Sequence, residues 1–127
     1  IRVVPMIGPS SILLALMASG MNGQRFTFHG YLERDERDLT VQLKELEQDS
    51  RKNDTTHIFI ETPYRNDKML TALMRVLAPS TRLCAAIDLT APDQQVINMS
   101  IEEWKRSKKL IGKKPAVFLL FSGKLST

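Results

Sequence analysis

The chain has 127 residues, of which 43% are hydrophobic and 25% are charged, and these proportions exclude bulk disorder and indicate one globular domain. Its longest apolar run, Ile12 to Ala18, is well short of the roughly 20 residues that a membrane-spanning helix needs. The single cysteine, Cys84, excludes an intrachain disulfide and fits a reducing cytoplasm, and the net charge of +4 is mild.

The first predicted elements are an extended start and an apolar helix. The chain begins at Ile1 rather than at a methionine, so we expect it to be a piece of a longer protein. Ser10 and Ser11 suit a helix start, and Gly20 suits its end. The helix between them is apolar on nearly every side, so it is either fully internal or shared between the sheet and a second domain or subunit.

A short strand and an amphipathic helix come next. Residues 26–28 alternate as in a strand, and a densely charged stretch follows at residues 31–38. Residues 51–54 are expected to form the loop that leads to the next strand. The helix between the charged stretch and this loop has an apolar stripe at four- and three-residue spacing, formed by Leu39, Leu43 and Leu46.

The middle of the sequence predicts a buried strand, a sharp corner and a helix. His57 to Ile60 is apolar and β-branched, as in a strand covered on both faces. Thr62 suits a helix N-cap that binds a free N–H group through its hydroxyl, and Pro63 suits the first helical position. In open α/β sheets, ligands bind at the carboxyl ends of strands, so Glu61 and Arg65 are candidate site residues. Their spacing fits a solvated ion pair equally well.

The second half predicts two further strands and a helix before the last strand. Residues 82–87 form a strand with small side chains in its middle, and residues 95–99 resemble an edge strand. Ser100 and Glu103 form a capping box for a short helix, which Gly112 is expected to break.

The last strand, Pro115 to Phe121, is too apolar to lie anywhere but in the centre of the sheet. Strands and helices interleave without strict alternation. We therefore predict an α/β fold, a single domain with one mixed sheet of about five strands and helices on its faces.

Self-contained chemistry is not evident from the sequence. No Cys/His cluster has metal-ligand spacing, so we expect no metal site, and no pattern couples His29 or His57 to a nucleophile. His57 is expected to be a structural residue. The basic residues between Lys105 and Lys114 suit either a phosphate-binding surface or a solvated face.

Five motifs in a fixed order support a more specific interpretation. The motifs are Val4-Pro5-x-x-Gly8-Pro9-Ser10-Ser11, the stretch from Ala15 to Gly20, the stretch from Arg25 to Leu32, Phe59-Ile60-Glu61-Thr62-Pro63-Tyr64-Arg65, and Ala86-Ile87-Asp88-Leu89-Thr90. On these motifs, the chain resembles the C-terminal half of the tetrapyrrole methylase family, and within it the branch of small-subunit ribosomal RNA cytidine 2′-O-methyltransferases. The likeness covers nearly the whole chain.

The resemblance implies a two-domain enzyme that is dependent on S-adenosylmethionine, usually dimeric, with the cofactor in a trough between the domains. Residues 1–127 would be the C-terminal domain, and the N-terminal domain would precede Ile1. Carried over by position, the cofactor contacts are Ile60, Glu61, Thr62, Cys84, Ala85, Pro115 and Ala116. Residues 1–8 match the interdomain segment, in which Pro5, Gly8, Pro9 and Ser10 would flank the trough.

The chain departs from the RNA-modifying branch at two places. The loop at residues 33–38 is nearly neutral where that branch is usually basic, and residues 87–91 lack two usual positive charges. Because phosphate backbones bind through Lys and Arg, a paralogue with a changed substrate is one interpretation. The methyl acceptor is then ribosomal RNA or a small molecule such as a tetrapyrrole.

Three functional hypotheses remain open at this point. The first is a methyltransferase domain in which Glu61 and Arg65 orient the ligand, with no residue identified as a general base. The second is a non-catalytic dimerisation module that uses the apolar helix at residues 12–18. The third is a nucleic-acid-binding module that uses Lys105 to Lys114.

Overall fold

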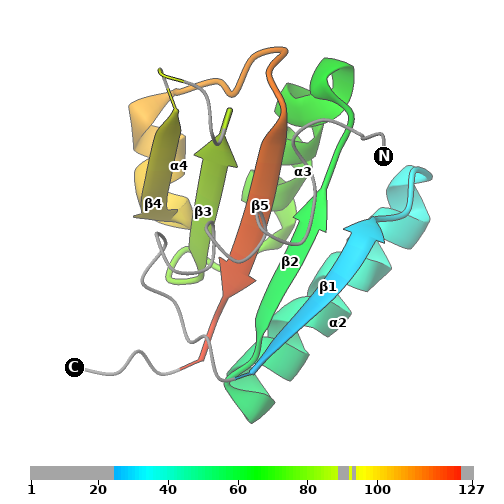
Figure 1. The fold of residues 1–127 in the computed structure, drawn as a ribbon. Helices are drawn as coiled ribbons and strands as arrows, with labels where there is room; N and C mark the ends of the chain where they lie inside the picture. The colour runs from blue at the N-terminus through cyan, green and yellow to red at the C-terminus, as the bar shows by residue number, and fades with distance from the viewer. Residues whose placement is uncertain (1–24, 89–91, 93, 124–127) are drawn as a thin grey trace.

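The computed structural model describes residues 25–88, 92 and 94–123. The predicted apolar helix, the dimerisation surface built on it and the interdomain segment, with Pro5, Gly8, Pro9 and Ser10, lie outside the described residues. The elements in chain order are β1 (Phe26–Tyr31), α2 (Glu36–Asn53), β2 (Thr56–Ile60), the short 3-10 helix η1 (Pro63–Arg65), α3 (Asn66–Val76), β3 (Arg82–Ile87), β4 (Gln95–Ser100), α4 (Ile101–Ser107) and β5 (Ala116–Phe121) (Figure 1).

The described strands form one mixed sheet in the order β1-β2-β5-β3-β4. β1 and β2 are parallel, whereas β5 runs antiparallel to both β2 and β3, and β4 is antiparallel to β3. Every residue of β5 is buried, as its apolar sequence requires in the centre of a sheet. The predicted α/β fold with a five-stranded mixed sheet is confirmed, as are the central place of β5 and the edge place of β4.

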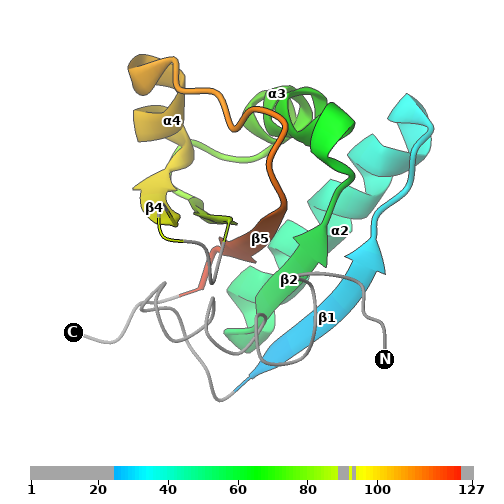
Figure 2. The ribbon, with the colours of Figure 1, turned by 45° about the horizontal axis from the view of Figure 1, so that its top comes forward.

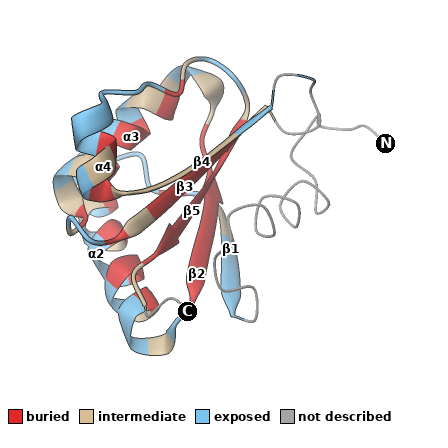
Figure 3. Cartoon of the chain, turned by 90° about the vertical axis from the view of Figure 1, so that its left-hand side faces the viewer, coloured by how far each residue is buried: buried red, intermediate tan, exposed pale blue. Residues whose placement is uncertain are grey.

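The two faces of the sheet carry separate apolar clusters. α2, α3 and α4, which are the described α-helices, all lie against one face (Figure 3). There Phe59 of β2 stacks on Phe118 of β5, with ring centroids 5.5 Å apart. Trp104 of α4 is fully buried and donates a hydrogen bond from Nε1 to the Leu83 carbonyl at 2.8 Å, which fixes α4 over β3 (Figure 2). The other face carries a smaller buried cluster, whose members are Ile58, Ile60, Cys84, Ala86, Val117, Leu119 and Phe121.

Two helices end at positions that the sequence analysis missed. α2 continues through residues 51–53, which were expected to be a loop, and its C-cap is Asp54 in the left-handed conformation. α4 ends at Ser107 with Lys108 as its left-handed C-cap, so Gly112 lies beyond the helix rather than breaking it. Neither cap is a glycine, and therefore the usual sequence signal for a helix end is absent. The capping box of Ser100 and Glu103 is present as predicted.

The helix start after β2 also differs from the prediction. Thr62 is the N-cap, but of η1, and its side chain makes no capping hydrogen bond. The Thr62 carbonyl, and not its hydroxyl, accepts a hydrogen bond from the Arg65 N–H, at 2.9 Å. The chain thus makes one tight 3-10 turn before α3 begins at Asn66.

Candidate cofactor-binding corner

Most of the predicted site residues that the structure describes lie at one end of the sheet. β2 ends there at Ile60, which pairs with Val117 at the start of β5, and Ala116 pairs with Ile87 at the end of β3. We call this end the corner, and define it as residues 60–67, Asp88 and residues 111–116. Its backbone therefore brings residues 60–62 next to residues 115–116, two of the segments that the resemblance implies as cofactor contacts.

Glu61 and Arg65 pair with each other at the corner. Glu61 is 6% exposed, and its Oε1 accepts a hydrogen bond from the Thr62 N–H at 2.8 Å. Arg65 Nε lies 3.4 Å from Glu61 Oε2, and the Arg65 side chain is 25% exposed. The pair is therefore not simply a solvated surface pair, since its carboxylate is buried and held by two donors. Such charge-assisted bonds hold the chain in its sharp turn between β2 and η1.

Cys84 and Ala85 do not lie at the corner. Cys84 pairs with Leu119 and Ala85 with Phe118, so both sit in the middle of β3, and both are completely buried. Burial raises the pKa of the Cys84 thiol to about 12, so this side chain is a neutral part of the core. In the described structure, neither side chain has free surface for a nucleoside. A cofactor contact at these two residues stays a prediction that this conformation does not favour.

The other predicted contacts differ in how accessible they are. Ile60 and Ala116 are 9% and 1% exposed, whereas Thr62 and Pro115 are half-buried. The accessible part of the predicted contact set thus consists of Thr62, just after β2, and Pro115, just before the neighbouring strand β5.

The first turn of α3 is hydrogen-bonded to the loop that leads into β5, a feature that the sequence analysis missed. Asn66 is fully buried, and its Nδ2 donates to the carbonyls of Gly112 at 3.1 Å and Lys114 at 2.7 Å. Asp67 Oδ1 accepts from the N–H groups of Ile111 at 2.6 Å and Gly112 at 3.2 Å. These bonds hold the start of β5 against the end of β2. An Asn-Asp pair at a helix start looks like ordinary capping, so the sequence alone offers no signal for this contact.

Asp88 and Tyr64 are the other residues that the sequence analysis did not assign. Asp88 has a φ of 56°, and its N–H donates to the Pro115 carbonyl at 2.7 Å. It follows a strand, unlike Asp54 and Lys108, the other described non-glycine residues with positive φ, which cap helices. An L-residue in this conformation is held there by its surroundings.

Tyr64 is 82% exposed, and Lys113 Nζ lies 5.4 Å from the centre of its ring. Lys114 Nζ lies 4.0 Å from Asp88 Oδ2. The corner thus presents an aromatic ring, which can stack on a base, and a carboxylate, which can accept hydrogen bonds from ribose hydroxyls.

These contacts also divide the basic stretch at residues 105–114. Lys105, Arg106, Lys108 and Lys109 are exposed at the end of α4, whereas Lys113 and Lys114 engage Tyr64 and Asp88 at the corner. The role of this stretch in binding nucleic acid stays a prediction.

The histidines lie at the opposite end of β2 and bind each other. His29 Nε2 and His57 Nδ1 are 2.8 Å apart, and His57 Nε2 lies 2.8 Å from Asp49 Oδ2. Burial lowers the pKa of both His57 and His29, and the Asp49 carboxylate opposes that shift. His57 therefore has a partner for each ring nitrogen, as expected of a structural residue. Among the described residues, no group of three His, Cys, Asp or Glu side chains has the arrangement of a metal site.

No helix within the part of the chain that the structure describes is long and apolar enough to cross a membrane.

Comparison with known proteins identifies relatives in sequence and in fold. No model of a known protein family matches the chain. The chain is 31% identical over 113 residues to the ribosomal RNA small subunit methyltransferase I of Bacillus subtilis (strain 168), which is 87% of this chain and 37% of that protein. It is 34% identical over 95 residues to the protein of the same name from Synechocystis sp. (strain ATCC 27184 / PCC 6803 / Kazusa), which is 75% of this chain and 33% of that protein. The chain thus spans about a third of the length of these curated relatives.

Solved structures show the same fold. The methyltransferase CobJ superposes with a TM-score of 0.55 and 19% identity, over 86% of this chain and 46% of CobJ. The cobalamin biosynthetic enzyme CbiF, a cobalt precorrin-4 methyltransferase, superposes with a TM-score of 0.54 and 12% identity, over 87% of this chain and 48% of CbiF. The chain therefore has the fold of about half of these methyltransferases.

The curated relatives show that the chain belongs to the family of ribosomal RNA small subunit methyltransferases I, which confirms the predicted resemblance to the tetrapyrrole methylase family. Within that family, the curated relatives are ribosomal RNA small subunit methyltransferases I.

Proposed function

We propose that residues 1–127 are the C-terminal, cofactor-binding domain of an S-adenosylmethionine-dependent methyltransferase that modifies ribosomal RNA. The observation that carries this proposal is that 87% of the chain is similar to a ribosomal RNA small subunit methyltransferase I. The N-terminal domain of the same protein would complete the cofactor trough, with residues 1–8 as the interdomain segment. The whole protein would act as a homodimer in the cytoplasm, where its ribosomal RNA substrate is found.

The residues of the corner fit the cofactor at its accessible edge. Thr62, just after β2, and Pro115, just before β5, are half-buried, and the Tyr64 ring is exposed. When bound, S-adenosylmethionine supplies an electron-poor methyl group. The backbone around Thr62 and Pro115 would bind the nucleoside part, while Cys84 and Ala85 would support it from within the core.

The role of Glu61 and Arg65 in this proposal is to orient rather than to transfer a proton. The buried Glu61 carboxylate holds the Thr62 N–H at 2.8 Å, and Asn66 and Asp67 hold the loop before Pro115. The edge that would meet the cofactor is thus built before the cofactor arrives. Preorganisation of this kind lowers the entropy that binding and reaction must lose.

Ribosomal RNA is preferred over a small molecule as the methyl acceptor because sequence identity to the ribosomal RNA methyltransferases is 31 to 34%, against 12 to 19% for the two enzymes matched by fold. The loop at residues 33–38 has four acidic and two basic residues and so lacks the usual excess of positive charge, which favours a changed substrate. A tetrapyrrole or another small molecule is the second candidate.

Titration calorimetry of S-adenosylmethionine into the full-length protein tests the proposal. We expect Glu61→Gln to weaken binding by about tenfold, because the amide cannot hold both the Thr62 N–H and Arg65 as the carboxylate does. Glu45→Gln, an exposed change on α2, is the matched control and should leave the affinity unchanged. Absence of binding to the unaltered protein would overturn the cofactor assignment, and equal affinities of the two variants would overturn the role of the corner.

Transfer of a radiolabelled methyl group tests the acceptor. Small ribosomal subunits from a strain that lacks the gene should accept the label from the full-length protein. Labelling of a metabolite fraction in place of the subunits would overturn ribosomal RNA as the acceptor and favour the small-molecule alternative.

A further inference from the structure

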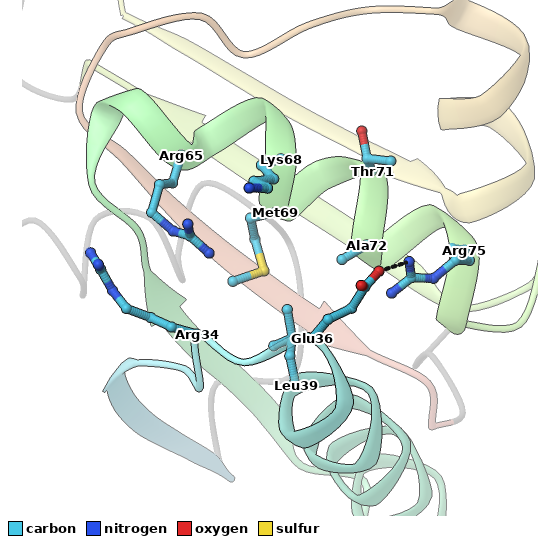
Figure 4. Close-up of a pocket in the computed structure, with 9 residues that line it drawn as sticks. All are labelled: Arg34, Glu36, Leu39, Arg65, Lys68, Met69, Thr71, Ala72 and Arg75. Atoms are coloured by element: carbon cyan, nitrogen blue, oxygen red, sulfur yellow. Dashed lines mark hydrogen bonds and ion pairs between the residues drawn. The ribbon is translucent and has the colours of Figure 1, made fainter.

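A cavity of about 300 Å³ lies between the start of α2 and α3, on the helix-covered side of the sheet (Figure 4). Most of the charged side chains that line it are basic. The charged side chains that line it are four cations, Arg34, Arg65, Lys68 and Arg75, and one carboxylate, Glu36.

The cations come from two separate segments of the chain. Arg34 lies in the connection between β1 and α2, whereas Arg65 ends η1 and Lys68 lies in the first turn of α3. Figure 4 shows Arg34 and Arg65 at the same end of the cavity, each on a different segment of the chain. Positive charges gathered in one cavity repel each other, and a bound anion would relieve that repulsion.

Two of the carboxylates near the cavity, those of Glu36 and Asp35, have partners within the chain. Glu36 Oε2 accepts from Arg75 at 2.8 Å, so these two residues neutralise each other. Asp35, beside Arg34 in the chain, accepts from the N–H groups of Arg37 and Asp38 as the N-cap of α2. Among residues 25–88, 92 and 94–123, no carboxylate forms an ion pair with Arg34 or Lys68.

Arg65 is the third cation of this set. Only its Nε is directed to Glu61, at a long distance of 3.4 Å. A guanidinium has further N–H donors, and these remain suited to an anion in the cavity.

The walls of the cavity favour a bound anion. The remaining lining includes the buried side chains of Leu39, Met69 and Ala72. Apolar walls reduce the local dielectric constant, which strengthens the attraction between a bound anion and the cations. Guanidinium groups on two sides match the geometry of phosphate oxygens, which they bind in pairs.

We propose that this cavity is a phosphate-binding site in which Arg34 and Arg65 hold phosphate oxygens from two sides and Lys68 adds a third positive charge. The ligand is a phosphate group, either of an RNA backbone or of a small phosphorylated molecule. The site goes beyond the proposed cofactor corner, and it connects to that corner through Arg65, which binds Glu61.

Two probes and the full-length protein test the site without any cofactor present. Pyrophosphate binding is measured by calorimetry, and binding of a short fluorescent single-stranded RNA by anisotropy. We expect Arg34→Gln combined with Lys68→Gln to weaken whichever probe binds by about tenfold or more. Both side chains are exposed, so the fold should survive the change.

The matched control is Lys44→Gln combined with Lys52→Gln, which removes the same charge from exposed positions on α2 outside the cavity and should have a much smaller effect. Arg34→Lys combined with Lys68→Arg keeps the charge and should retain most of the binding. If RNA is the ligand, the first double variant should also lower the slope of log affinity against log salt by about 1.4, since each contact with a single strand contributes about 0.7.

Binding of RNA alone would assign the site to a nucleic-acid backbone, and binding of pyrophosphate alone to a small phosphorylated ligand. The proposal is overturned if neither probe binds, if the cavity variant binds as tightly as the unaltered protein, or if the control weakens binding equally. Because Arg34 and Lys68 lie outside the corner, S-adenosylmethionine affinity in these variants separates a failure of this site from a failure of the proposed function.

Discussion

The two ends of the sheet satisfy their polar groups in different ways. At the end where β3 starts and β5 finishes, the buried Glu47 carboxylate accepts from the Ala78 N–H at 2.7 Å and from the Thr81 hydroxyl. The Thr81 hydroxyl lies 3.0 Å from Ser122 Oγ, and the Ser122 N–H donates to Ser50 Oγ at 2.7 Å. This network is closed, because each of these groups finds its partner inside the protein.

At the corner, buried bonds instead support groups that face outward. Glu61, Asn66 and Asp67 are bound within the chain, while Tyr64 is 82% exposed and Asp88 is held with a positive φ. The comparison indicates that one end of the sheet mainly stabilises the fold and the other positions groups for a ligand.

The largest effect is expected at the closed end. Glu47→Ala should lower the free energy of unfolding by about 2 to 3 kcal/mol, because the Ala78 N–H and the Thr81 hydroxyl lose a charged acceptor in a buried place. Urea unfolding of the variant measures this loss. Glu45→Ala, exposed on the same helix, should change stability by less than about 0.5 kcal/mol. Equal stabilities of the two variants would contradict the assigned role of Glu47.

A smaller loss of stability, with a local signature, is expected at the corner. Asp67→Ala should cost about 1 to 2 kcal/mol, because the N–H groups of Ile111 and Gly112 lose their acceptor but lie close to solvent. Amide hydrogen exchange at Ile111 and Gly112 should become faster, and S-adenosylmethionine should bind less tightly. Thr71→Ala, on the exposed side of α3, is the control. A loss as large as that of Glu47→Ala, with unchanged exchange in the loop, would remove the contrast between the two ends.

The smallest effect concerns the histidine pair and depends on pH. Burial lowers the pKa of His57 and His29 from the ordinary value of 6.5, although the Asp49 carboxylate raises both in part. Between the lowered values and 6.5 the unfolded chain binds more protons than the folded one, so stability is full above that window and is lost as the pH falls through it.

Urea unfolding at a series of pH values from about 7.5 to about 5.5 measures this dependence. His29→Gln should make it weaker, because one of the two titrating groups is gone and the amide can still donate to His57 Nδ1. Asp49 does not contribute within this pH range. The hydrogen bond from Asn53 is the main cause that lowers the pKa of its carboxyl, so the stability that Asp49 contributes is lost only near pH 3.8 and below. An unaltered pH dependence in His29→Gln would contradict this account.

Local signals in the sequence predicted much of the fold. The limits of β3 and the capping box of α4 are as expected, because small and apolar runs and a Ser-x-x-Glu pattern act over a few residues. The ends of α2 and α4 were missed because their left-handed caps, Asp54 and Lys108, are not glycines. For the site, the pairing of Glu61 with Arg65 followed from their spacing, whereas the depth of Cys84 and Ala85 did not.

Alternation, capping and helix periodicity act within short stretches of the chain. The amino-acid sequence alone therefore predicts most of the strands and helices and the polar residues that follow β2. The way in which these segments pack against each other depends on the tertiary structure. Pairing of β3 with β5 placed Cys84 and Ala85 in the core, and the contacts of Asn66 and Asp67 with the loop at residues 111–114 span more than forty positions of the chain. The cavity of Arg34, Arg65 and Lys68 likewise joins the connection before α2 to the segment formed by η1 and the start of α3. Strand register and helix packing minimise the free energy of the whole core, so they cannot be predicted from a few neighbouring residues.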